Sequence, residues 1–383
     1  MLKQYLKWQI SKWWPIMLVG ALLLAIPFVS IMQSSSIVYK TAPYHSQYIP
    51  ISNTAFIALA IMASMFALAL PAFIFVYRGS LQAVDCFYQA GFEARTIRRT
   101  RVILGLVFLL VAFTVAYWIG VFVLGMRYIA TPAVVTTDTS STVRADIHFG
   151  YFALAYLAFV VILAAQYFTN CFFASLGDQM FVQIALMVCG LILQSLIMMA
   201  PVLYCEMTAS LSGRSGDPLS AAFRYCYGPI GMTSALVQLI SPLIEGGQNP
   251  WGANSIWWVM SLVISVLFGA GSCVYLFISK EPSGEYAGHW KARNVYIGLI
   301  PHVTALVIGV ALSTVVGINT GVSIVSGYAL MLFFDVSYFA LLALLRKSFK
   351  PAKLDLILYL SVVGVVLLLS LAMTVVASAA YGR

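Results

Sequence analysis

The sequence contains very few charged residues. Only 9% of its 383 residues are Asp, Glu, Lys or Arg, whereas 62% are hydrophobic. A soluble domain carries about 25% charged residues, so this chain has too little polar surface to cover itself in water. It therefore needs lipid as the solvent for much of its length. We expect a multi-pass protein of the cell (plasma) membrane, with the lipid bilayer as its main surroundings.

Acidic residues are especially scarce. Twelve Asp and Glu stand against 21 Lys and Arg, which gives a formal net charge of +9. Nucleic-acid binding would need a basic face on a soluble domain. Here the basic residues occur in short clusters between long apolar runs, the pattern that membrane topology produces. The sequence therefore predicts no nucleic-acid partner.

Histidine and cysteine are too few and too scattered for a metal site. The four histidines fall in different segments, and no two cysteines have the Cys-x-x-Cys spacing of a zinc site. Cys171, Cys189 and Cys273 lie in or beside apolar runs, where cysteine behaves as a small hydrophobic residue. Cys205 and Cys226 share one predicted outer loop and could form a disulfide, which the sequence alone does not decide.

The sequence also lacks the motifs of an ATPase or of another enzyme. No Gly-x-x-x-x-Gly-Lys-Ser/Thr segment is present to hold the phosphates of a nucleotide. The acidic residues lie on different loops, so no nucleophile, base and acid are expected to converge in one pocket. We therefore expect no enzymatic activity and no cofactor in this chain, and any ATP and magnesium would be bound by a partner subunit.

Nine apolar runs are long enough to cross a bilayer. A spanning helix needs about 20 apolar residues, because each backbone polar group must be satisfied within the segment. The runs lie near residues 14–33, 54–77, 102–125, 149–172, 179–203, 254–279, 295–317, 322–345 and 354–380. The first is longer than the core of a signal peptide and is read as an uncleaved span. Residues 1–383 are thus predicted to form a single all-α transmembrane domain, a polytopic helical bundle.

The distribution of basic residues sets the orientation. With the N-terminus in the cytoplasm, fifteen of the 21 lysines and arginines lie inside, which agrees with the positive-inside rule and puts the C-terminus outside. Residues 229–244 are apolar but too short to span, and a crossing there would reverse the later basic loops. We therefore read them as a re-entrant or interfacial helix within the extracellular loop 204–253.

The cytoplasmic loop 78–101 carries most of the functional information. Leu81, Val84, Phe87 and Tyr88 fall on one face of a short helix, which Gly91 ends. Such an amphipathic helix can dock in a groove of a partner protein. It can equally lie on the membrane surface with its arginines toward anionic lipid.

The same loop resembles part of a known family. The run Asp85-x-Phe87-x-x-x-Gly91-Phe92, followed by Arg95, Arg98 and Arg99, is similar to the loop after the second span of ABC-type exporter permeases of Gram-positive bacteria, the antimicrobial-peptide (lantibiotic) type. It has Gly91 where proline is usual in that family and Phe87 where tyrosine is common. Two later segments, 279–288 and 346–350, also resemble stretches of these permeases.

The resemblance implies a function and partners. Leu81, Val84, Asp85, Phe87, Tyr88, Gly91, Phe92 and Arg95 would form the coupling helix that sits on a separate ATPase subunit, itself a dimer. The chain would work with a second copy or a related permease, and would export an amphipathic peptide or lipid-like substrate.

One predicted span holds a carboxylate in its interior. Asp335 lies within residues 322–345, where a charge costs about 2.5–3.5 kcal/mol on insertion scales. It could sense substrate or conformation in a translocation path, or it could form a structural hydrogen bond with Ser337, Tyr338 or a neighbouring helix. Early in the seventh span, His302 reads as a packed or interfacial histidine rather than the partner of an acid. The alternative function is an ion- or proton-coupled carrier centred on Asp335.

Overall fold

The computed structural model describes most of the helical part of the chain. The described residues are 2–34, 38–41, 53–79, 93–131, 134–137, 140–144, 149–177, 179–211, 255–279, 298–309, 333, 335–341, 343–344, 353, 355–365 and 368. Among them, four helices are long and apolar enough to cross a membrane. These are α1 (Leu2–Ser34), α2 (Asn53–Phe75), α4 (Ala94–Ala130) and α5 (Gly150–Ser175). They support the prediction of a multi-pass membrane protein.

The remaining described helices also fall on predicted spans. They are α6 (Met180–Leu211), α9 (Ser255–Ile278), two shorter helices Gly298–Gly309 and Asp355–Val365, and helical residues at 335–341. Because parts of the last three spans lie outside the described residues, the number nine stays a prediction. Helix α6 runs on past residue 203, so Cys205 is helical and not part of a loop. The segment 229–244 lies outside the described residues.

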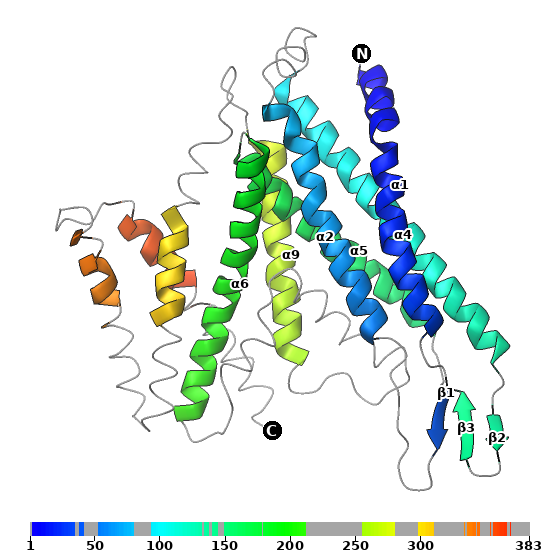
Figure 1. The fold of residues 1–383 in the computed structure, drawn as a ribbon. Coiled ribbons are helices and arrows are strands. Elements are labelled where there is room, and N and C mark those ends of the chain that lie inside the picture. The colour runs from blue at the N-terminus through cyan, green and yellow to red at the C-terminus, as the bar shows by residue number, and fades with distance from the viewer. Residues whose placement is uncertain are drawn as a thin grey trace. The chain divides into compact units, whose positions relative to one another are not determined.

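The chain divides into two compact units. The first comprises Met1–Ile184 and Met232–Tyr286, and the second comprises Ala185–Gly231 and Ala287–Arg383. In the first unit, α1, α2, α4 and α5 run in alternating directions, and α1 packs mainly on α4 while α5 packs mainly on α9 (Figure 1). Apolar side chains of α1, α2, α4 and α5 make one core, in which Phe28, Phe113 and Phe159 surround Tyr117.

Close contact between α5 and α9 depends on a small residue. A Cβ atom on Gly269 would lie 2.5 Å from Cα of Ala165 and 2.8 Å from its carbonyl oxygen. These are backbone atoms that cannot move aside, so only glycine allows the two helices to approach this closely.

A proline in α2 creates a polar requirement that α5 meets. Pro71 has no N–H, so the carbonyl of Ala67, four residues earlier, lacks its partner within the helix. Nδ2 of Asn170, from α5, donates to that oxygen at 3.2 Å. One turn earlier on α5, Gln166 accepts a hydrogen bond of 3.1 Å from the hydroxyl of Ser64 on α2. The two helices are thus joined by polar contacts within an apolar interface.

A small sheet was not part of the all-α prediction. Strands β1 (Val38–Thr41), β3 (Ser140–Arg144) and β2 (Val134–Thr137) form an antiparallel sheet in that order, with Lys40 opposite Thr142 and Thr142 opposite Val135. It lies beyond the C-terminal ends of α1 and α4 (Figure 1), in loops predicted to be extracellular. The valines and threonines of 134–137 and 141–143 favour strands.

Candidate functional site

Four arginines at the start of α4 form a cluster that the helix itself does not explain. Arg95, Arg98, Arg99 and Arg101, which we call the arginine cluster, occupy its first two turns, and no acidic residue accompanies them in the first turn. Cations at a helix N-terminus oppose the helix dipole. The favourable partners of these side chains must therefore come from other helices.

The C-terminus of α9 supplies most of those partners. Arg95 donates from Nε and Nη2 to the carbonyl oxygen of Phe277, at 3.2 and 2.8 Å, and Arg99 donates to the same oxygen at 2.5 Å. Arg98, which is fully buried, donates to the carbonyl of Ser279 at 2.6 Å. The last carbonyls of a helix have no partner within it and lie at the negative end of its dipole. The arginine cluster therefore caps α9.

The end of α2 is held in the same way. Nη1 of Arg101 donates to the carbonyl of Ile74 at 3.2 Å, and Nε2 of Gln183 lies 3.3 Å from the carbonyl oxygen of Phe75. The guanidinium of Arg101 also lies over the ring of Tyr77, 4.1 Å from its centroid, where a cation–π attraction adds to the contact. Tyr77 belongs to the 3-10 helix η1 (Val76–Gly79) that follows α2.

These contacts fix both ends of the loop that the sequence marks as functional. The loop leaves η1 at Gly79 and rejoins the structure at Glu93, directly before α4. Of the predicted coupling residues, Arg95 is described and caps α9. The others lie outside the described residues, namely Leu81, Val84, Asp85, Phe87, Tyr88, Gly91 and Phe92.

No family model, no curated protein and no solved structure matches this chain. The geometry of its own residues therefore carries the functional argument.

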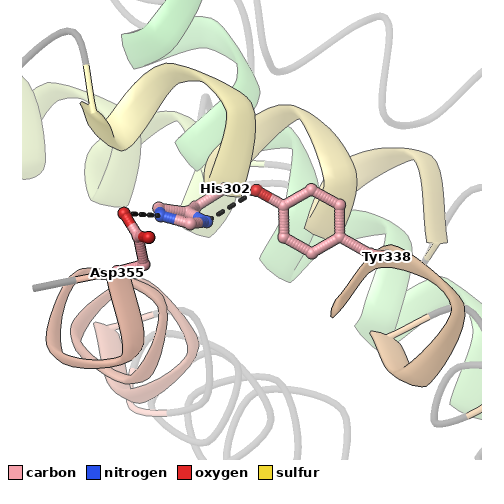
Figure 2. A network of polar contacts seen from close by, with 3 residues as sticks. All are labelled: His302, Tyr338 and Asp355. Atoms are coloured by element: carbon pink, nitrogen blue, oxygen red, sulfur yellow. Dashed lines mark hydrogen bonds and ion pairs between the residues drawn. The ribbon is translucent and has the colours of Figure 1, made fainter. Parts of the chain in front are cut away.

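A second polar cluster lies within the second unit. His302 is only 2% exposed, and its Nδ1 is 2.7 Å from the hydroxyl of Tyr338 (Figure 2). Its other ring nitrogen, Nε2, faces the Asp355 carboxylate at 3.8 Å. The three side chains come from three separate helical segments and converge on the imidazole (Figure 2). We call them the histidine cluster.

Aromatic rings and another carboxylate border the histidine cluster. The ring of Tyr359 is 6.0 Å from that of His302 and 6.2 Å from that of Tyr338, measured between centroids. The side chain of Asp335 interacts with that of Tyr359, one helix away. Of the two nearby candidates, Ser337 donates to the carbonyl of Phe333, and Tyr338 contacts His302. Asp335 thus lies beside a neighbouring helix.

Sequence reasoning found only part of the histidine cluster. It treated His302 as a packed histidine, and the structure places it in a buried position that also has an acidic neighbour. Asp355 and Tyr359 were missed because they are far from His302 in the sequence, and no spacing rule links residues of different helices. The one available signal was a carboxylate and a histidine near the ends of two apolar runs.

Other predicted features find no site in the described part of the chain. No group of three or more His, Cys, Asp or Glu side chains able to hold a metal ion occurs among the residues that the structure describes. Cys226 and the side chain of Cys205 lie outside those residues, so their pairing stays open.

An open groove beside α5 and α9 has a mainly apolar lining, formed by Phe172, Leu267, Phe268, Gly271, Ser272 and Tyr275.

Proposed function

We propose that this chain is the permease subunit of an ABC-type exporter, whose ATP is hydrolysed by a separate ATPase subunit. The observation that carries the proposal is the position of the arginine cluster. Its side chains join the start of α4 to the last carbonyls of α2 and α9, at the base of the loop 80–92. A partner that moves this loop would therefore act on three helices at once.

The strength of these contacts suits that role. Hydrogen bonds from charged groups contribute about 1.5–3 kcal/mol each, and Arg98 and Arg101 are buried, so water competes little with them. The stacking of Arg101 on Tyr77 also links the segment that enters the loop with the segment that leaves it. A displacement of the loop would thus be transmitted as a movement of helices rather than lost in a flexible hinge.

The proposed cargo comes from the resemblance of the loop 78–101 to ABC-type exporter permeases. An amphipathic peptide or a lipid-like molecule would find an apolar groove beside α5 and α9, whose described lining residues carry no charge. Hydrocarbon groups bind in such a groove without the cost of burying a charge.

The test is co-purification of the partner. The full-length tagged protein is extracted gently from its native membrane, and co-eluting chains are identified for the wild type and for the Phe87→Ala/Phe92→Ala variant. We expect an ABC ATPase with the wild type and a recovery about tenfold lower with the variant, because two aromatic anchors of an interface are removed. The control is Phe122→Ala, an exposed phenylalanine on α4 well away from the loop.

The outcomes separate the proposal from its alternative. If no ATPase accompanies the wild type, the exporter proposal is wrong. An ion- or proton-coupled carrier would then be the better hypothesis, because a buried histidine with carboxylates near it is the kind of group that such a carrier needs. If the ATPase binds the wild type and the loop variant equally, the permease assignment stands and the coupling-helix assignment fails.

A further inference from the structure

We propose that His302, Tyr338 and Asp355 form a proton-binding site, in which the imidazole binds the proton and the Asp355 carboxylate supplies the counter-charge. The ligand is the proton itself, taken from water and returned to it. The site belongs to the second unit and does not depend on an ATPase partner.

The geometry provides both partners that a protonated imidazole needs. When His302 is protonated, Nδ1–H donates to the hydroxyl oxygen of Tyr338 across 2.7 Å, and Nε2–H points toward the carboxylate of Asp355 at 3.8 Å. When His302 is neutral, Nδ1 can instead accept the hydroxyl proton, and the carboxylate faces a ring without charge. The imidazole therefore keeps its tyrosine contact in both states, and the proton changes only the pairing with the acid.

The low exposure of His302 and Asp355 makes the charge of this site energetically important. The side chains of His302 and Asp355 are 2% and 13% exposed. Charge in such a place is costly unless an opposite charge lies near it, because the charged group has left water. A proton on the imidazole places a positive charge beside the carboxylate, so the packed arrangement favours the protonated imidazole.

Four other ionisable groups of the second unit deserve comparison among the residues that the structure describes. Tyr338 and Asp335 belong to the segment 335–341, and Tyr359 lies one turn beyond Asp355. Lys353 lies two residues before Asp355 and is exposed, so solvent screens its charge. In the same unit, residues 185–195 of α6 include Cys189 and no charged residue. Both carboxylates, Asp335 and Asp355, favour uptake of a proton.

Proton binding is thereby linked to the packing of three helical segments. The site exists only while Gly298–Gly309, 335–341 and Asp355–Val365 remain together. A rearrangement that moves Asp355 away from His302 would remove the counter-charge and release the proton, and by linkage the pH would bias that rearrangement.

The experiment follows the imidazole directly. The full-length protein with isotope-labelled histidine is titrated by NMR in lipid nanodiscs from about pH 5 to about pH 9. The signal of His302 is the one absent from His302→Gln. We expect the Asp355→Asn variant to move its titration midpoint to lower pH by more than about one unit, because a facing negative charge is lost. Glu93→Gln, which neutralises an exposed carboxylate whose charge is screened by solvent, is the matched control and should leave the midpoint unchanged.

A second variant protects the test against misfolding. Asp355→Glu keeps the charge and should hold the midpoint closer to that of the wild type than Asp355→Asn does. If Asp355→Asn does not fold, Asp355→Ser, which also removes the carboxylate, takes its place in the comparison with Asp355→Glu and should lower the midpoint in the same way. A midpoint of His302 that none of these folded variants moves, or a His302 that does not titrate at all, would overturn the proposal.

Discussion

At the scale of single residues, Asn170 of α5 donates the hydrogen bond that Pro71 cannot supply within α2. Asn170→Leu should destabilise the protein by about 1–3 kcal/mol, because the carbonyl of Ala67 is then buried without a donor. In a Pro71→Ala background, the new N–H restores the bond within α2, and the same substitution should cost clearly less. Thermal unfolding of the four proteins in detergent measures this double-mutant cycle.

The cycle has a definite contradicting result. Equal costs of Asn170→Leu in both backgrounds would mean that the carbonyl of Ala67 is not what Asn170 satisfies. The cost would then have to come from packing alone, since leucine differs from asparagine mainly by its polar group.

At the scale of helices, the arginine cluster shows what sequence can and cannot predict. The hydrophobic runs alone predicted both ends of α2, α5 and α9 to within a few residues, because lipid demands uninterrupted apolar helices. They predicted α4 too short at both ends, since its first turns carry the arginines. The same sequence placed Arg98 and its neighbours near the cytoplasmic face by charge statistics. It could not indicate that they cap α9, because the acceptors are backbone carbonyls, which carry no residue-specific signal.

The site around His302 was missed for a related reason. A contact between helices depends on their rotation and spacing, which a single sequence does not encode in its periodicity. His302 and Asp355 each look unremarkable within their own segments. The sheet of β1, β2 and β3 was not predicted for another reason. Its strands have only four or five residues, which is too short for a clear alternating pattern in a chain dominated by long apolar runs.

The capping of α9 can be tested through its most buried member. Arg98→Met should lower the free energy of unfolding by about 1.5–3 kcal/mol, because a charged donor is removed from the carbonyl of Ser279. Arg98→Lys keeps the charge but not the planar fork of donors, so its free energy of unfolding should lie between those of the wild type and Arg98→Met.

A matched basic residue provides the control. Lys12→Met removes an exposed cation whose described contact is the Trp8 ring, 5.2 Å from its centroid, and should change stability by no more than about 0.5 kcal/mol. Thermal unfolding in detergent compares the three variants with the wild type. A loss for Arg98→Met no larger than that for Lys12→Met would show that the cap contributes little to stability.

At the scale of the whole molecule, orientation is the property on which the functional proposals depend. Helix α4 offers a direct test because its apolar segment, Arg95–Ala130, has 36 residues. At 1.5 Å per residue it is about 54 Å long, well beyond the roughly 30 Å of the hydrocarbon core. Both of its ends should therefore reach water, one on each side.

Single cysteines at the two ends of α4 decide the orientation. In a background without the six native cysteines, Glu93→Cys and Ile129→Cys place one thiol at each end, at positions that are exposed in the structure. By the positive-inside rule, a membrane-impermeant reagent added to intact cells should label the second and not the first, and inverted vesicles should give the opposite result. The reversed pattern would put the loop 80–92 outside, where no ATPase could bind it, and labelling of both from one side would mean that α4 does not cross the membrane.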